Sequence, residues 1–224
     1  MKKRNPEIFY GIQPILAVLA MWVTQDIAIR FFFSNKKILG KEHLSTLKGS
    51  VILAPTHRSR WDGLLLTYAL GRRETNKDCR FMVTDPEMKG LQGWFLKRLG
   101  CFSINQDCPS LSSLRYALKL IINKKQVVIF PEGRINKHGK NLPLKQGLFR
   151  LAQLAKKKGS SVHIVPIGIA YDEVIPNFRG KVALCIEEPF NIDKLSNISI
   201  DEFNYSLRNK INRAEQKALT QVGR

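Results

Sequence analysis

The sequence predicts an α/β fold: a mixed, mostly parallel central sheet flanked by helices and preceded by an N-terminal membrane-associating helical segment. Two observations lead to this prediction. Short aliphatic runs alternate with longer helical patterns along the 224-residue chain, which is typical of sheets covered by helices. Residues 8–25 carry no charged side chain and are largely apolar. We therefore place the helical segment at residues 1–37 and the α/β domain at residues 38–224.

The N-terminal segment predicts membrane association. Lys2, Lys3 and Arg4 precede an apolar core, "PILAVLAMWV". Crossing a bilayer takes roughly 20 apolar residues, and Gln13 and Gln25 dilute this stretch. No A-x-A cleavage site follows the core, so we expect an uncleaved, partly inserted helix with its basic start on the cytoplasmic side. The folded domain would then lie on the cytoplasmic face of a membrane. A long helix buried against the domain is the alternative.

The later elements each have a local signal. Continuous aliphatic runs indicate buried strands, and periodic apolar patterns indicate helices. Ser110 is a suitable N-cap, Gly100 ends a helix, and Pro131 and Gly133 break a strand. The expected strands are residues 50–55, 80–84, 101–104, 126–133, 162–171 and 181–189, and the expected helices are residues 61–70, 88–100, 110–124, 146–158 and 201–221.

The charge balance narrows the class of partner. Lysine and arginine number 37 against 18 acidic residues, which gives a net charge of +19. Such a charge favours nucleic acid, an anionic membrane or an acidic protein as partner. No helix-turn-helix, zinc-finger or aromatic RNA-binding signature is visible, and a nucleic-acid protein has no need of the apolar N-terminus. We therefore expect an anionic membrane surface and no nucleic acid, and a basic nucleic-acid-binding module is the distant alternative.

The four cysteines, at positions 79, 101, 108 and 185, form no C-x-x-C pair. This spacing predicts neither a zinc site nor a disulfide framework. We expect no metal, and a reducing, cytoplasmic setting for the main domain.

Two turns that follow buried strands carry the candidate chemistry. "THRSRWD" follows "VILAP", and "FPEGR" follows "QVVI". Ligands gather at the carboxyl ends of strands in open α/β sheets. The ordinary pKa of histidine suits His57 as a general base, and the Asp62 carboxylate would fix its tautomer from the other ring nitrogen. The alternative is that Asp62 only caps a helix that begins at Gly63.

Four blocks of sequence in a fixed order identify a resemblance. They are "HRSRWD" with His57 and Asp62, "GCFSINQ" at residues 100–106, "FPEGR" at residues 130–134, and "VPIGIAY" at residues 165–171. In this order and spacing the chain resembles the glycerolipid acyltransferases, best known as 1-acylglycerol-3-phosphate (lysophosphatidate) acyltransferases. The resemblance covers roughly residues 38 to 170.

This resemblance implies transfer of an acyl group from acyl-CoA or acyl-carrier protein to the free hydroxyl of lysophosphatidate, making phosphatidate for phospholipid synthesis. His57 would take the proton from the acceptor hydroxyl, and Asp62 would orient His57. No acyl-enzyme is implied, and no G-x-S-x-G elbow occurs. The resemblance implies no metal or organic cofactor.

The resemblance also assigns residues to the acceptor. The "EGR" turn would bind the acceptor phosphate through Arg134, with Lys140 among the lysines that extend the positive pocket. Pro166 and its apolar neighbours would line or support the site. The expected substrate-binding residues are Glu132, Gly133, Arg134, Arg58, Arg60, Lys137, Lys145 and Pro166.

The chain departs from the family pattern at two places. Gln106 stands where an arginine is usual, and Ile135 and Asn136 follow Arg134 where Thr-Arg-Ser is common after the Glu-Gly pair. Arg58 and Arg60 would then replace the missing positive charge or contact lipid headgroups. These departures leave open another lysophospholipid or glycerol 3-phosphate as acceptor. A hydrolase, in which water replaces the acceptor, is the other alternative.

Overall fold

A mixed sheet forms the centre of the protein in the computed structural model, which describes residues 11–45, 47, 49–105, 110–192 and 198–224. The strand order is β1-β7-β6-β2-β5-β3-β4, with β8 beside β6. Only the β6–β7 and β6–β8 pairs are antiparallel, so the predicted mixed, mostly parallel sheet is confirmed. The strands are β1 (Phe33–Leu39), β2 (Ser50–Pro55), β3 (Cys79–Thr84), β4 (Phe102–Ile104), β5 (Gln126–Val128), β6 (Val162–Tyr171), β7 (Gly180–Ile186) and β8 (Phe190–Asn191).

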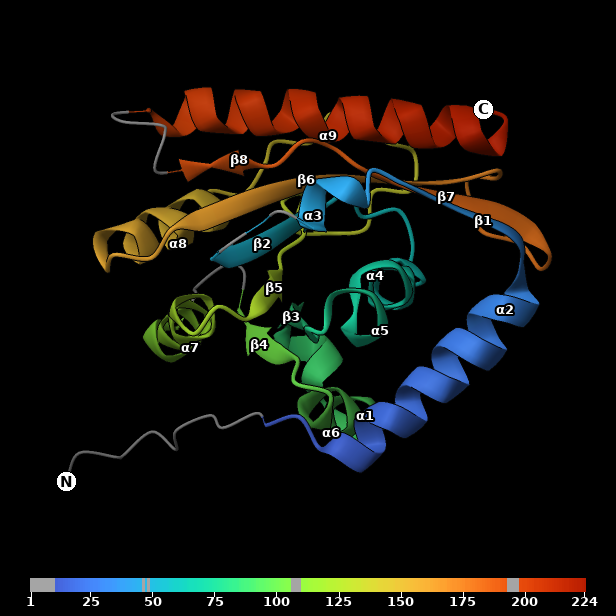
Figure 1. The fold of residues 1–224 in the computed structure, drawn as a ribbon, viewed down its shortest axis with the longest axis horizontal. Coiled ribbons are helices and arrows are strands. Elements are labelled where there is room, and N and C mark those ends of the chain that lie inside the picture. Colours follow the sequence, from blue (N-terminus) through green and yellow to red (C-terminus); the bar gives the residue numbers. More distant parts are fainter. Residues whose placement is uncertain (1–10, 46, 48, 106–109, 193–197) are drawn as a thin grey trace.

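Helices cover both faces of this sheet (Figure 1). Strand side chains alternate between the faces, so Ile52 of β2 packs with α7, α8 and α9, while Leu53 packs with α2 and α4. The helical elements are α1 (Pro14–Met21), the π-helical η1 (Trp22–Ala28), α2 (Ile29–Phe32), α3 (Glu42–Ser45), α4 (Asp62–Leu70), α5 (Arg72–Thr75), the 3-10 turn η2 (Asp85–Met88), α6 (Gly90–Arg98), α7 (Leu111–Ile122), α8 (Gly147–Lys157) and α9 (Ile200–Val222).

The N-terminal helix runs without a break from α1 through η1 to α2. This stretch, Pro14–Phe32, has a mean hydropathy of 1.6, and by length and composition it could cross a bilayer. Only 22% of it is buried, so it is not the long core helix of the alternative interpretation. Gln25 donates to the carbonyl of Thr67, and Asp26 pairs with Arg73, so polar contacts attach the helix to α4 and α5. The predicted cytoplasmic anchor residues Lys2, Lys3 and Arg4 lie outside the described residues.

Several element boundaries differ from the prediction. Strand β1 was not predicted, because its sequence "FSNKKIL" is polar; it lies at the edge of the sheet, where charged side chains face solvent. It also crosses the predicted boundary at residues 37/38. The strand expected at 126–133 ends at Val128, where the chain turns through "FPEG". The helix expected at 88–100 is split by an extended residue, Lys89, into η2 and α6.

The other predicted elements are found within a few residues of their expected ends. Ser110 caps α7 by accepting a hydrogen bond from the backbone N–H of Ser113. The C-terminal helix α9 begins with a capping box between Ser199 and Glu202. Figure 1 shows α9 lying lengthwise along β6 and β7. This position brings a segment from the end of the chain over the carboxyl end of β2.

Candidate active site

His57 lies two residues beyond the carboxyl end of β2, and the intervening Thr56 is hydrogen-bonded to the neighbouring strand. The Thr56 N–H donates to the Ile167 carbonyl at 2.9 Å, and its hydroxyl accepts from the Ile169 N–H at 2.9 Å. Both partners belong to β6, so the β2–β6 pairing continues past Pro55. The backbone at His57 is therefore held by the sheet itself.

His57 and Asp62 meet as the sequence predicts. Nδ1 of His57 is 2.9 Å from Oδ2 of Asp62, whose side chain is fully buried. The same Oδ2 accepts the backbone N–H groups of Arg58 at 2.6 Å and Ser59 at 2.8 Å. Helix α4 begins at Asp62 with Trp61 as its N-cap and without a side-chain capping bond. Asp62 therefore does not cap a helix starting at Gly63, and its carboxylate organises the preceding loop instead.

Tyr171 completes the environment of Asp62, and no role was predicted for it. Its hydroxyl donates to Oδ1 of Asp62 at 2.6 Å, from the last residue of β6. Burial, with the charge of Asp62, raises the pKa of this hydroxyl well above its usual range, so Tyr171 stays a donor at neutral pH. Tyr171 is the last residue of the fourth sequence block, but the 109-residue separation from Asp62 gave no sign of the contact.

The other edge of the His57 ring is open. The imidazole stacks on the Phe130 ring, with centroids 3.9 Å apart, and the side chain is 20% exposed. Among the residues that the structure describes, none hydrogen-bonds Nε2. The ring is thus fixed by a carboxylate on one nitrogen and by an aromatic face, and its second nitrogen remains available to a substrate.

Arg58 lies next to His57 in sequence but is buried. Its guanidinium pairs with Glu132 through Nη1 at 2.8 Å, and with Glu215 of α9 through Nη2 at 2.7 Å and through Nε. Burial lowers the pKa of Arg58, but the hydrogen bonds and charges of Glu215 and Glu132 outweigh that effect and raise it. Arg58 was predicted to contact the acceptor phosphate or headgroups, and the structure instead commits its guanidinium to two carboxylates.

Gly168 allows α9 to reach this network. A Cβ at Gly168 would lie 2.1 Å from the backbone nitrogen of Glu215, so only glycine permits this close approach of helix to strand. Arg208 of α9, about two helical turns before Glu215, lies 3.8 Å from Glu132. Glu215 and Arg208 were not predicted as site residues, because nothing local in the sequence links α9 to the "FPEGR" turn.

The "FPEGR" turn is hydrogen-bonded to the loop that carries His57. Glu132 is buried and accepts from the His57 backbone N–H at 3.3 Å and from the Asn136 side chain at 3.2 Å. The Asn136 N–H donates to the His57 carbonyl at 2.7 Å. Gly133, at φ 71°, closes the turn with a hydrogen bond to the Phe130 carbonyl. Glu132 thus links the "FPEGR" turn to the loop of His57 and Arg58.

The remaining predicted residues differ in exposure. Arg134, Lys137, Lys140 and Lys145 are exposed on or after the turn, and the Lys145 backbone is fixed to the Pro131 carbonyl. Arg60 is exposed and pairs with Glu87, whereas Pro166 is buried within β6 opposite Ala54. Gln106 lies outside the described residues. In the described part of the chain, no group of three or more metal-ligating side chains occurs.

Comparisons with known proteins place these residues in a family context. The model of the Acyltransferase family matches residues 35–170, which is more than half of the chain. A 1-acyl-sn-glycerol-3-phosphate acyltransferase from Streptococcus pneumoniae is 23% identical over 208 residues, covering 91% of this chain and 70% of that protein. A protein of the same name from Bacillus subtilis is 31% identical over 121 residues, covering 54% of this chain and 57% of that protein.

Two further matches are a sequence match to part of a much longer protein and a match to a crystal structure. A glycerol-3-phosphate acyltransferase from Alteromonas mediterranea is 30% identical over 138 residues, and the chain spans only 16% of its length. The crystal structure of the 1-acyl-sn-glycerophosphate (LPA) acyltransferase from Thermotoga maritima superposes with a TM-score of 0.68, at 20% identity, over 89% of this chain and 78% of that one. At that identity the structural match shows the fold alone.

Proposed function

The chain belongs to the acyltransferase family, and we propose that it moves a fatty acyl group from an acyl thioester to the free hydroxyl of lysophosphatidate, making phosphatidate for phospholipid synthesis. The donor in this proposal is acyl-CoA or acyl-carrier protein. The observation that carries the proposal is the His57–Asp62 pair, with one imidazole nitrogen on a buried carboxylate and the other open. The names of the S. pneumoniae and B. subtilis relatives favour lysophosphatidate as acceptor.

His57 is the general base of the proposed reaction. Its Nε2 takes the proton from the acceptor hydroxyl while that oxygen attacks the thioester carbonyl carbon. The carbon–sulfur bond then breaks, and the sulfur leaves with the proton that His57 holds. Asp62 accepts the Nδ1–H, which fixes the tautomer with a free lone pair on Nε2 and stabilises the imidazolium.

The acceptor phosphate has a candidate binding loop beside the base. Arg134 and Lys137 are exposed on the segment that Asn136 ties to the His57 carbonyl. A planar guanidinium can hold a phosphate through two hydrogen bonds. Because one hydrogen bond joins this loop to His57, a bound phosphate would lie at a fixed distance from the base, which is what direct attack by a hydroxyl on the same substrate needs.

Glycerol 3-phosphate is a second candidate acceptor, since the A. mediterranea relative carries that name. Another lysophospholipid is the third, because Gln106 and the "EGRIN" stretch depart from the usual pattern. In each case the chemistry at His57 is the same, and only the group that supplies the hydroxyl differs. Water in place of any acceptor would make the enzyme a hydrolase.

The test is a product assay on membrane-reconstituted protein. Labelled acyl-CoA and acyl-carrier protein would be offered with lysophosphatidate, other lysophospholipids and glycerol 3-phosphate. His57→Ala should abolish transfer, and His138→Ala, which removes an exposed histidine from the neighbouring loop, is the matched control. We expect phosphatidate from lysophosphatidate with wild type and control only. Normal turnover by His57→Ala would exclude it as the base, and release of fatty acid alone would indicate a hydrolase.

A further inference from the structure

One corner of the molecule combines exposed apolar side chains with cations that form no ion pair among the described residues. It consists of the end of α2, the start of β1 and the β6–β7 loop, and we call it the aromatic corner; its residues are Arg30, Phe31, Phe32, Lys36, Ile175, Phe178 and Arg179. We propose that the aromatic corner binds the anionic phospholipid headgroups of a bilayer and seats the edge of the active site on the membrane. The inference rests on the proposed lipid substrate and adds a second membrane contact to the N-terminal helix.

The apolar part of the corner is unusually exposed. Phe31 is 64%, Ile175 66% and Phe178 69% accessible to solvent. Phe178 meets the ring of Phe32 edge to face at a centroid distance of 6.2 Å, and the Arg179 N–H donates to the Phe32 carbonyl at 2.6 Å. The β6–β7 loop is therefore attached to the end of the N-terminal helix, and both present large apolar groups outward.

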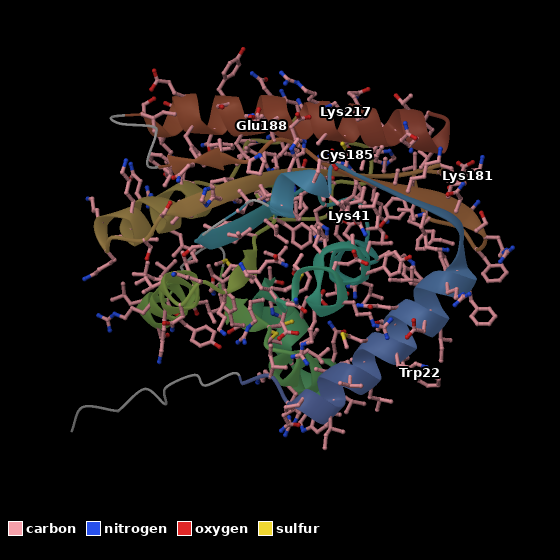
Figure 2. The ribbon with its side chains drawn as sticks, viewed as in Figure 1. Trp22, Lys41, Lys181, Cys185, Glu188 and Lys217 are labelled. Carbon is pink, nitrogen blue, oxygen red and sulfur yellow. The ribbon has the colours of Figure 1, made fainter. Side chains whose placement is uncertain are left out.

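The corner continues an apolar face of the N-terminal helix. Ala17, Ala20 and Ile29 are buried on the side that meets the domain. The exposed apolar side chains lie on the other side, in steps of three or four positions with two adjacent pairs: Ile15, Val18, Leu19, Trp22, Val23, Ile27 and Phe31. Figure 2 shows Trp22 midway along this helix, and Lys181 at the end of β7 toward which the helix runs. An apolar face of this length, with basic side chains gathered at its C-terminal end, suits a helix that lies against a bilayer.

Three cations at the corner form no ion pair in the described part of the chain. The hydrogen bond from Arg73 and the charges of Arg73 and Arg30 lower the pKa of Asp26, one helical turn before Arg30, but Asp26 forms its ion pair with Arg73. Among the described residues, no carboxylate pairs with Arg30, Lys36 or Arg179. Lys36 donates to the Phe33 carbonyl, and Asp172, in the same loop, accepts backbone N–H groups of Glu173 and Lys181 instead of a cation. Burial lowers the pKa of Lys36, and the charges of Arg179 and Arg30 lower it further. An anion at this position would relieve that repulsion.

The chemistry of the corner fits a headgroup layer better than a free anion. Aromatic rings favour the boundary between water and acyl chains, and basic side chains beside them favour an anionic leaflet. A soluble phosphate would use the three cations but would leave the exposed rings in water. Because the surface has both exposed rings and cations, anionic lipid is the ligand that uses all of it.

The corner is in contact with the catalytic loop, so its position sets where the active site lies relative to the bilayer. Phe32 stacks on Trp61, the residue before Asp62, with ring centroids 4.2 Å apart. Phe33 stacks on Tyr171, whose hydroxyl donates to Asp62. A membrane bound at the corner would therefore lie beside the Asp62 side of the site, where an acyl chain can enter without crossing bulk water.

The test is flotation of the full-length protein with vesicles. A charge variant carries Arg30→Gln, Lys36→Gln and Arg179→Asn, the last because asparagine tolerates the left-handed backbone at φ 63°. We expect its partitioning onto mixed phosphatidylglycerol–phosphatidylcholine vesicles to fall about fivefold per cation, hence about a hundredfold. On pure phosphatidylcholine its binding should equal that of the wild type.

The matched control removes three exposed cations from α8 and the residue that follows it, as Arg150→Gln, Lys157→Gln and Lys158→Gln, at a distance from α2 in the fold (Figure 1). It should bind both vesicle types as the wild type does. An equal loss in this control, or wild-type binding by the charge variant, would overturn the proposal. Because flotation needs no turnover, His57→Ala should bind normally, and a failure of the proposed reaction stays distinguishable from a failure at the corner.

A labelling experiment tests the corner without removing its charge. Phe178→Cys carrying a polarity-sensitive fluorophore, in a variant whose native cysteines at 79, 101, 108 and 185 are replaced by alanine, should shift to shorter emission wavelength on phosphatidylglycerol vesicles. The same label at Tyr205→Cys, on the exposed face of α9, should not shift. No shift at position 178 would contradict membrane contact at the corner, whatever the flotation result.

Discussion

His57 and Arg58 are neighbours in sequence, yet their side chains have opposite surroundings. His57 meets one carboxylate, keeps one nitrogen open and is one-fifth exposed. Arg58 meets two carboxylates, Glu132 and Glu215, and is buried. The two side chains leave the loop after β2 toward different partners, so one short segment supplies one group for the substrate and one for the interior. In the proposed reaction His57 therefore performs the chemistry, while Arg58 and its two carboxylates hold the loop in shape.

Asp62→Asn should produce the largest effect on the chemistry at His57. The amide keeps the shape of the side chain but favours the wrong tautomer of His57, so we expect kcat to fall by roughly 10³- to 10⁴-fold with the fold retained. Steady-state kinetics with a thermal melt would check this. Adding His57→Ala should lower kcat little further, since the two residues act as a unit. Additive losses would contradict a shared role.

Glu215→Gln removes a partner of Arg58 and should lower stability more than catalysis, the opposite of Asp62→Asn. Loss of one carboxylate leaves the buried Arg58 partly uncompensated, and we expect unfolding to become easier by about 3 kcal/mol, as measured by urea denaturation. Surviving molecules should keep a KM near that of the wild type. Glu188→Gln, at an exposed acid near α9, is the control and should change stability little. A large KM increase without loss of stability would place Glu215 in substrate binding instead.

Arg134→Gln tests the same contrast between two arginines. Arg134 is exposed on the turn beside His57, whereas Arg58 is internal. If Arg134 binds the acceptor phosphate, KM for that acceptor should rise about 10- to 100-fold, with unchanged stability and unchanged donor KM. Arg115→Gln, an exposed arginine on α7, is the control. An unchanged acceptor KM would remove Arg134 from the phosphate site.

The sequence predicted those parts of this arrangement that depend on local order. The buried strands, the capped helices and the five-residue step from His57 to Asp62 are readable because each is set by neighbours in the chain. Arg58 was assigned to substrate by its nearness to His57, and only the tertiary structure places it against Glu215, 157 residues later. Strand β1 was missed for the same reason, because a polar edge strand is defined by its partner β7 and not by its own composition.

Tyr171→Phe should have the smallest effect. It tests whether the hydrogen bond from Tyr171 to Asp62 contributes to catalysis in addition to the orientation of His57 by Asp62. The lost hydrogen bond to Asp62 involves a charged acceptor, so we expect a loss of about 2 kcal/mol in unfolding free energy at neutral pH. We expect kcat to fall about tenfold, because Asp62 would still orient His57 through its other oxygen.

The pH dependence of the unfolding free energy distinguishes the hydrogen bond of the Tyr171 hydroxyl from the packing of its ring. The folded pKa of Tyr171 is raised above 10.0, so its contribution to stability is complete below about pH 10 and is lost as pH rises further. Burial also raises the pKa of the Cys79 and Cys101 thiols to about 12, but both proteins contain them and their effect cancels in the comparison. The stability gap between wild type and Tyr171→Phe should therefore narrow by about 1.4 kcal/mol for each pH unit above 10. A gap that stays constant in urea titrations up to about pH 11 would mean that the Tyr171 hydroxyl contributes no protonation-dependent bond to Asp62, and that the ring alone supports the site.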